Sequence, residues 1–512
     1  MVPPGARSRR PLNGAFLIFG LLLLACVAFA GPPPVPSAQA VASAHPLATR
    51  AGLDVMDVGG NAFDAAVAVS AVLAVVEPYS SGIGGGGFWL LHRASDGRQV
   101  MLDGRERAPL AAHRDMYLDE QGEVVGGLSM DGALAAGIPG EPAALAYLAE
   151  HYGRLPLKKT LAPAIRLAEA GFEVDDYYRR MARFRLEVMQ RYPSTATVFL
   201  HNGEVPPAGM LIKQPDLALT LKALAEKGRQ GFYAGTVASR LVDGVRAAGG
   251  IWTLQDLHKY RVVEREPVSF NYRGLRVVSA SPPSSGGIAL ATMLHILEGR
   301  DLTGLAQAER AHLAVEAMRR AYRDRAQYMG DPDFVDMPLQ RLVDPMYAAG
   351  LRASIRADRA TPSAALPGSV HSVEGTDTTH FSILDREGNR VAATLSVNYP
   401  FGSGLVVPGT GVLLNDEMDD FSAKPGVPNA YGLVGAEANA IEPGKRPLSS
   451  MTPTFVESEH GIAILGTPGG SRIITMVLLG ILDLEAGNAP QSWVSLPRFH
   501  HQYLPDVIQY EP

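Results

Sequence analysis

The order of apolar and polar positions along the chain predicts helices and strands that alternate without a repeat. Residues 62–76 are apolar on nearly every face of a helix, and Asn61 stands directly before them, where its side chain can cap the helix. This run therefore predicts a buried helix. Short apolar runs bounded by turn residues predict strands at 88–92, 99–102, 275–279 and 461–465.

The pattern changes after residue 378. Residues 378–384 and 390–396 read as two strands joined by the polar turn 385–389, which predicts a hairpin. The middle third, 141–350, is largely helical. Near the end, the turn 466–471 leads from a strand into a helix over 472–482. Helices early and late in the chain, with strand pairs on both sides of position 378, predict a layered α/β sandwich.

Composition indicates a folded protein of enzyme size. The chain has 512 residues, of which 46% are hydrophobic and 19% charged, enough apolar residues to build a large core. The net charge is −6, and no basic stripe occurs anywhere, which argues against a nucleic-acid partner. No cysteine motif of the zinc-binding type occurs, so neither a metal ion nor another cofactor is expected.

The N-terminal segment predicts export. Three arginines precede the apolar run Ala15–Ala30, which is too short to span a bilayer comfortably. Residues 1–40 are therefore expected to be a signal peptide with a Pro-rich linker, and the mature protein to reach a bacterial periplasm. The single cysteine, Cys26, lies inside the apolar run, so the mature chain has no disulfide. A lipoprotein at Cys26 fits less well because bulky leucines precede it.

The start of the predicted hairpin, residues 377–382, carries candidate chemistry. A threonine hydroxyl is a poor nucleophile at neutral pH and needs a nearby base. Cleavage of the chain between Asp377 and Thr378 would free an α-amine with a pKa of about 7.7–8.0, which can take the hydroxyl proton. His380 is a rival base on the same strand face, but parallel side chains do not readily turn toward each other, so a structural role is expected. Taken alone, this segment has ordinary strand composition.

Four longer motifs, in this order, closely resemble the γ-glutamyltransferases (γ-glutamyltranspeptidases), which belong to the N-terminal nucleophile hydrolases: 377–382, 415–422, 446–451 and 466–472. Shorter segments that look like the same family are 59–62, 105–106, 283–287 and 330–334. The resemblance begins near Val41 and runs to the C-terminus.

This resemblance implies a four-layer αββα sandwich. It also implies a precursor that cleaves itself between Asp377 and Thr378. The large subunit, 41–377, and the small subunit, 378–512, would stay together as one domain. The implied activity is hydrolysis or transfer of γ-glutamyl groups from glutathione and related compounds, with water, amino acids or dipeptides as acceptors.

The resemblance also assigns roles to individual residues. Thr378 would attack the γ-amide carbonyl and form an acyl-enzyme, with the Ser396 hydroxyl opposite it across the hairpin. Gly469 and Gly470, between a strand and a helix, would supply the backbone amides that stabilise the oxyanion. The residues expected to bind the glutamyl carboxylate are Arg105, Ser449 and Ser450, and those expected to hold its ammonium are Asn398, Glu417 and Asp420.

Tyr431, within the loop 425–432, resembles the lid that covers the pocket in this family. Its presence favours a transferase over the cephalosporin acylases of the same group, which lack the lid. A glutaryl or cephalosporin-type acylase with the same threonine nucleophile stays open as an alternative. A second alternative is an unprocessed, non-catalytic periplasmic protein that binds γ-glutamyl compounds.

Two departures from the family pattern bear on these expectations. Family members usually continue for some tens of residues beyond the position of Pro512, and this missing piece normally adds strands that close the small subunit. The segment 484–497 also matches the family loosely. The sequence therefore predicts an exposed sheet edge and leaves open whether the chain processes itself.

Overall fold

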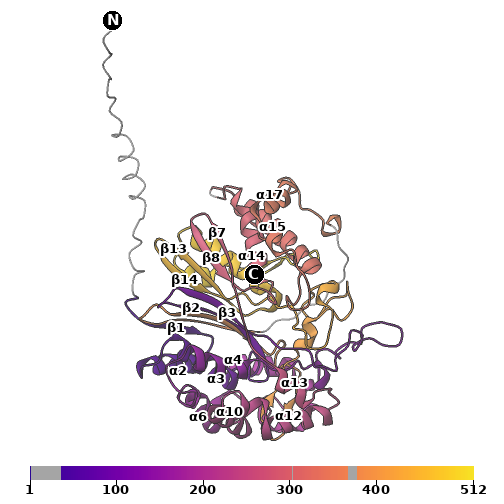
Figure 1. The fold of residues 1–512 in the computed structure, drawn as a ribbon. Coiled ribbons are helices and arrows are strands. Elements are labelled where there is room, and N and C mark those ends of the chain that lie inside the picture. Colours follow the sequence, from indigo (N-terminus) through magenta and orange to yellow (C-terminus); the bar gives the residue numbers. More distant parts are fainter. Residues whose placement is uncertain (2–35, 303, 367–377, 512) are drawn as a thin grey trace.

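Two antiparallel sheets form the centre of the computed structural model (Figure 1), which describes Met1 and residues 36–302, 304–366 and 378–511. In spatial order, the first sheet consists of β1 (Ala40–Ser43), β9 (Thr379–Leu384), β10 (Arg390–Ser396), β2 (Gly86–Arg93), β3 (Arg98–Gly104) and β6 (Val263–Arg265). The second consists of β14 (Gly461–Leu465), β13 (Thr454–Ser458), β8 (Leu275–Ser279) and β7 (Val268–Tyr272). Apolar residues from both sheets, among them Phe88, Val278 and Phe455, pack between them.

Helices cover the outer face of each sheet (Figure 1). Those on the side of the first sheet include α2 (Pro46–Asp57), α3 (Ala62–Val76), α4 (Glu141–His151), α6 (Ala162–Ala170), α10 (Pro215–Lys227) and α12 (Gly235–Ala247). Those on the side of the second include α14 (Gly286–Glu298), α15 (Gln307–Tyr328), α17 (Pro345–Ala353) and α18 (Ile473–Glu485). The layers are therefore helix, sheet, sheet, helix.

Shorter elements connect these layers. The short helices are α5 (Leu157–Thr160), α7 (Asp176–Phe184), α8 (Leu186–Gln190), α9 (Pro193–Phe199), α11 (Gln230–Tyr233), α13 (Leu254–Lys259), α16 (Leu339–Leu342) and α19 (Pro490–Ser495). The short strands are β4 (Phe172–Glu173), β5 (Leu211–Ile212), β11 (Val406–Val407), β12 (Val412–Leu413), β15 (Phe499–His500) and β16 (Gln509–Tyr510).

Helix α3 lies at the centre of the larger core and has the bounds that the apolar run predicts. Every one of its residues is buried. The Asn61 side chain caps it by accepting hydrogen bonds from the amides of Phe63 and Asp64, at 3.0 Å each. The Asp64 carboxylate accepts a bond from the Asn61 amide in return, which completes a capping box. The packing of α3 against β9 and β10 fixes the hairpin from below.

The predicted hairpin is formed by β9 and β10, and its turn is tied to the start of α3. The amide of Ala62 donates to the Asp385 carboxylate at 2.9 Å, and the same carboxylate accepts a bond from the Asn389 side chain. Leu395 on β10 pairs with Thr379 on β9. This register brings the two ends of the hairpin, Thr378 and Ser396, side by side.

Several short strands were not predicted from the sequence patterns. The largely helical middle third contains β6 and β7 besides the expected β8, and β1 and β13 were not expected. In β7, Ser269 and Asn271 are exposed while Phe270 and Tyr272 are buried, so its alternation extends over only five residues. Strands this short form because a neighbouring strand supplies the hydrogen bonds, which a local pattern does not reveal. At the outer edge formed by β14, Ile462 is 49% exposed.

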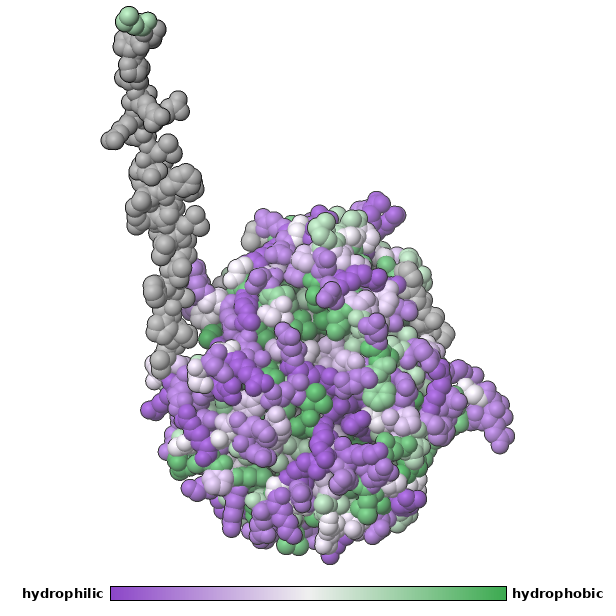
Figure 2. All heavy atoms as spheres, in the orientation of Figure 1, coloured by the Kyte–Doolittle hydropathy of each residue, from purple (hydrophilic) through white to green (hydrophobic). Residues whose placement is uncertain are grey.

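The face drawn in Figure 2 is dominated by hydrophilic side chains, with hydrophobic ones in small separate groups. This distribution is typical of a surface in contact with water. Among the helices of the described residues, none has the length and apolar content needed to cross a membrane.

Candidate active site

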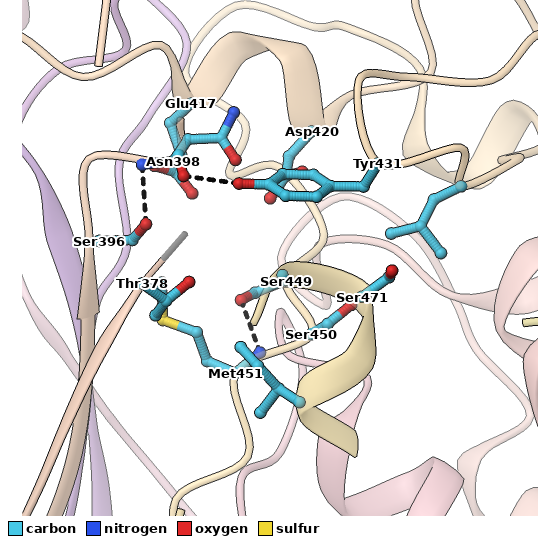
Figure 3. Close-up of a pocket in the computed structure, with 13 residues that line it drawn as sticks. Thr378, Ser396, Asn398, Glu417, Asp420, Tyr431, Ser449, Ser450, Met451 and Ser471 are labelled. Atoms are coloured by element: carbon cyan, nitrogen blue, oxygen red, sulfur yellow. Dashed lines mark hydrogen bonds between the residues drawn. The ribbon is translucent and has the colours of Figure 1, made fainter. Parts of the chain in front are cut away.

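One pocket brings together most of the residues that the sequence singles out (Figure 3). Side chains from the hairpin, from the loops after it and from the turn before α18 face one another across it. The sequence-predicted residues that line it are Thr378, Ser396, Asn398, Glu417, Asp420, Tyr431, Ser449, Ser450 and Gly470. These residues come from positions up to 92 apart in the chain, so the fold assembles the pocket.

Thr378 stands directly before β9 and is 5% exposed. Ser396 ends β10, and its hydroxyl oxygen accepts a hydrogen bond from the amide of Asn398 at 2.7 Å. Asn398 has a φ of 75°, a left-handed conformation that asparagine tolerates better than most residues. Its side-chain amide donates to the Asp416 carbonyl at 3.0 Å. The proposed cleavage partner, Asp377, lies outside the described residues, so the predicted autocleavage bond is not seen.

His380 is committed to other partners. Its Nδ1 lies 2.9 Å from the Thr394 hydroxyl and its Nε2 lies 3.2 Å from the Ser382 hydroxyl. Burial lowers the pKa of His380 to about 3. A group with so low a pKa is a weak proton acceptor at neutral pH. The geometry agrees with the structural role expected for this residue.

A buried acid, Glu77 at the end of α3, contacts β9 at Thr379. The Thr379 hydroxyl donates to the Glu77 carboxylate at 2.9 Å. Burial raises the pKa of Glu77 to about 7, and the bond from Thr379 opposes that shift. Glu77 therefore anchors β9 one residue beyond Thr378.

The turn before α18 has a backbone conformation that suits amide groups acting as hydrogen-bond donors to a ligand. Gly469 has a φ of 132° and Gly470 a φ of 56°, values that favour glycine. Among the described residues, no carbonyl or side chain accepts a hydrogen bond from either amide. Gly470 lines the pocket, whereas Gly469 lies one residue outside the lining. Both amides precede α18, where the helix dipole favours negative charge.

Tyr431 lies directly against this turn. A Cβ atom added to Gly470 would meet the Tyr431 ring at 2.4 Å, so only glycine permits this approach. The Tyr431 hydroxyl donates to the Asn398 carbonyl across the pocket (Figure 3). Its carbonyl accepts a bond from the Gln502 side chain at 3.0 Å, and Gln502 in turn accepts one from the Ser471 hydroxyl at 2.7 Å. Hydrogen bonds through Gln502 thus hold the loop 425–432 next to the turn 466–471.

Arg105 lies behind the pocket and is fully buried. Its Nε donates to the Pro447 carbonyl at 3.1 Å, and its two terminal nitrogens donate to the carboxylates of Glu417 and Asp420. Arg105 is therefore paired with the residues expected to hold an ammonium group. Its role as a ligand of the substrate carboxylate stays a prediction.

More than one acidic side chain surrounds the guanidinium of Arg105. Glu106 is also fully buried, and its carboxylate lies 3.7 Å from Arg105. Burial and the neighbouring Glu417 raise the pKa of Glu106 well above its ordinary value. Burial likewise raises the pKa of Glu417 to about 7, against the attraction of Arg105. An excess of buried acid makes this end of the pocket favourable for a cationic ligand group.

The two adjacent serines are held by a distant loop. The Ser449 amide donates to the Pro283 carbonyl at 2.8 Å, and the Ser285 hydroxyl donates to the Ser449 carbonyl at 2.8 Å. The Ser449 hydroxyl accepts a bond from the Met451 amide (Figure 3). The Ser450 hydroxyl accepts one from Arg325 at 3.2 Å. The motif 283–287 thus holds Ser449 in the pocket wall through hydrogen bonds.

Comparison with known proteins agrees with this arrangement. Residues 48–512 match the family model described as Gamma-glutamyltranspeptidase. The chain belongs to this family. It is 46% identical over 480 residues to the glutathione hydrolase proenzyme of Pseudomonas sp. (strain A14), in an alignment that covers 92% of this chain and 83% of the relative.

Solved structures support the fold of a γ-glutamyltranspeptidase. The crystal structure of Helicobacter pylori gamma-glutamyltranspeptidase is 42% identical, with a TM-score of 0.62, and the match covers 65% of this chain and 95% of that one. Cephalosporin acylase from Bacillus halodurans is 29% identical, with a TM-score of 0.77, and the match covers 93% of this chain and 86% of that one. The predicted αββα fold of the N-terminal nucleophile hydrolases and the predicted enzyme class are confirmed.

Three residues of this γ-glutamyltranspeptidase site were missed by sequence reasoning. Glu77, directly after α3, contacts Thr379 beside the nucleophile. Arg325 on α15 contacts Ser450, and Gln502 in the C-terminal segment contacts Tyr431. Arg325 and Gln502 lie in no motif that signals their contacts. Only the packing of these elements brings them to the pocket.

Proposed function

We propose that the protein cleaves the γ-glutamyl amide bond of glutathione and related compounds. It passes the γ-glutamyl group to water, to an amino acid or to a dipeptide. The observation that carries this proposal is one pocket with Thr378 and Gly470 at one end and Glu417 and Asp420, both paired with the underlying Arg105, at the other. The relative named glutathione hydrolase proenzyme supports it.

The proposed reaction begins after cleavage between Asp377 and Thr378. The Thr378 hydroxyl oxygen attacks the amide carbon, and its proton moves to the freed α-amine of the same residue. The tetrahedral intermediate collapses, the C–N bond breaks, and the leaving amine takes that proton. Water or an amine then attacks the acyl carbon, the ester bond to the Thr378 oxygen breaks, and the proton of the attacking group passes to that oxygen. The low pKa of His380 supports the α-amine as the base.

The amides of Gly469 and Gly470 face the developing oxyanion in this scheme. Loss of one oxyanion donor typically costs about 10²–10³ in rate. Because these amides have no other acceptor among the described residues, they are available without rearrangement. The hydroxyl of Ser396, opposite Thr378, orients the nucleophile.

The distal end would hold the zwitterionic glutamyl head group. Asp420 offers negative charge to its ammonium, and Glu417 and Asn398 add polar groups to the wall. Ser449 and Ser450 offer hydroxyls to its carboxylate. A site built to pair such groups rejects analogues that lack one by about 10⁴–10⁵.

The acylase alternative differs at this end, since a glutaryl group has no ammonium. The acidic cluster would then have no cationic ligand, so the geometry favours a γ-glutamyl substrate. The contact of Tyr431 with the Gly470 turn supports a covered pocket, as expected of a transferase.

We further propose that the enzyme works as a heterodimer of 41–377 and 378–512 in the periplasm. The proposed signal peptide and linker, residues 1–40, fall almost wholly outside the described residues. The periplasmic location rests on the sequence alone.

Denaturing gel electrophoresis of the purified protein tests the proposal. Self-cleavage gives two bands whose masses add up to the precursor, whereas the non-catalytic binding protein gives one. Assays with a γ-glutamyl anilide and a glutaryl anilide then separate the two enzymes. Faster cleavage of the glutaryl compound would contradict γ-glutamyl specificity.

A further inference from the structure

Arg325 differs from the other buried arginines of the described residues. Six of them form an ion pair with a carboxylate within 4.0 Å, namely Arg105, Arg185, Arg319, Arg320, Arg390 and Arg446. Arg325 is 4% exposed, yet within the described residues its guanidinium donates hydrogen bonds only to two hydroxyls. Among the described residues, its buried positive charge therefore has no ion-pair partner, and burying an unpaired charge is costly.

Both hydroxyl contacts of Arg325 lead to the pocket wall. Its Nη2 donates to the Ser450 hydroxyl at 3.2 Å, and its Nε donates to the Ser285 hydroxyl at 2.9 Å. Ser285 in turn donates to the Ser449 carbonyl. Arg325 thus supports both members of the serine pair. These two bonds use two of the five N–H donors of its guanidinium.

No acid in the described part of the chain forms an ion pair with Arg325. Asp420 attracts it electrostatically, but one carboxylate oxygen of Asp420 binds Arg105 and the other accepts a bond from Asn429 at 3.1 Å. Burial is the main effect on Arg325 and lowers its pKa. Its place in the last turn of α15 offsets only part of that cost, through the helix dipole.

We propose that Arg325 is a further specificity-determining residue of the pocket, which stabilises the α-carboxylate of the γ-glutamyl donor through the hydroxyl of Ser450. Because the Ser450 oxygen accepts from Arg325, its O–H is free to donate to an anion, and the guanidinium strengthens that bond. The pocket then separates its charges, with acids near the ammonium and Arg325 behind the carboxylate. This inference rests on the proposed γ-glutamyl substrate.

Two ligands that differ only in the α-carboxylate test it. L-Glutamate carries this group and 4-aminobutanoate lacks it, and both keep the amine and the terminal carboxylate. Inhibition constants are measured against γ-glutamyl anilide hydrolysis, or dissociation constants by calorimetry where a variant is processed but slow. Arg325→Met should weaken the binding of L-glutamate about 10- to 100-fold and change the binding of 4-aminobutanoate by no more than about twofold.

Two further variants keep the test decisive. Arg325→Lys retains the charge, so it should weaken L-glutamate less than Arg325→Met does, again without affecting 4-aminobutanoate. It also serves if Arg325→Met does not fold, as judged by thermal unfolding. Arg320, on the same helix, is paired with Glu316. Arg320→Lys is therefore the control, and it should change the binding of both ligands by the same factor.

Equal weakening of both ligands in the Arg325 variants, or no weakening of either, would overturn the role of Arg325. A wild-type protein that does not cleave the γ-glutamyl anilide would instead overturn the proposed function.

Discussion

The two ends of the pocket are built from different chemistry. The end at Thr378 consists of hydroxyls and backbone amides, and burial lowers the pKa of His380, on the adjoining strand, to about 3. The other end holds the carboxyl groups of Glu417 and Asp420 around the guanidinium of Arg105. The difference indicates a division of labour: charge recognises the substrate, while the reaction needs a base that the chain must make by cleaving itself.

The ends also differ in their support. Thr378 directly precedes β9 and Ser396 ends β10, and these two hydrogen-bonded strands pack against α3. Glu417 and Asp420 lie on a single 3-10 turn, Glu417–Asp420, which the Ser129–Asp419 bond at 2.7 Å ties to a distant loop. Changes at the first end should therefore affect the reaction itself, and changes at the second should affect the choice of substrate.

The largest effect is expected at the nucleophile. Thr378→Ala removes the hydroxyl that both self-cleavage and turnover require, so the protein should stay one chain and lose at least about 10⁴ in kcat/KM. Gel electrophoresis and an anilide assay measure the two outcomes. Thr379→Ser, which keeps the hydroxyl that binds Glu77, is the control and should still be processed. Cleavage of the Thr378→Ala protein at the same bond would refute the scheme.

A selective loss is expected at the acidic end. Asp420→Asn removes negative charge from the ammonium site, so kcat/KM for a γ-glutamyl anilide should fall about 10³-fold. A glutaryl anilide, which lacks the ammonium, should be affected much less. Asp419→Asn is the matched control, because Asp419 binds Ser129 and the Ala430 amide and does not line the pocket. An equal loss with both anilides would show that the charge serves structure alone.

A smaller loss is expected at the turn. Gly470→Ala places a methyl group 2.4 Å from the Tyr431 ring at a φ of 56°, so the turn or the tyrosine must shift. We expect kcat to fall about 10²-fold, the range for a displaced oxyanion donor. Gly480→Ala is the control: a Cβ there meets nothing within 4 Å, and alanine favours the helix. Unchanged kcat in Gly470→Ala would exclude this turn from the oxyanion site.

The smallest effect concerns pH. Burial raises the pKa of Glu417 to about 7 from the ordinary 4.5. The folded protein therefore favours its protonated form, and the stability that this provides is present below about pH 4.5 and is lost as the pH rises through 7. Relative to Glu417→Gln, the unfolding temperature should decline between pH 5 and 8, measured in the Thr378→Ala background to keep one chain. Parallel pH profiles would mean that Glu417 is not protonated in the folded state.

Local patterns predict the elements that position the nucleophile. The apolar run of α3 and the β9–β10 hairpin are legible because their residues interact with near neighbours in the chain. The bounds of β14 also match the prediction. β13 was missed because it is stabilised by pairing with β8, about 180 residues earlier in the chain.

The site could be predicted in part for the same reason. Motif resemblance locates Thr378, Asp420 and the serine pair, all of which line the pocket. It does not reveal that Arg105 pairs with the acids, nor that Arg325 contacts Ser450 across 125 residues. The Arg325 contact depends on how α15 packs against α14, which no local sequence pattern encodes.

The N-terminal sequence and mass of the smaller fragment of active protein test the central claim most directly. The account predicts a fragment that begins at Thr378 with a free α-amine. An active protein in which the bond between Asp377 and Thr378 is intact would contradict it.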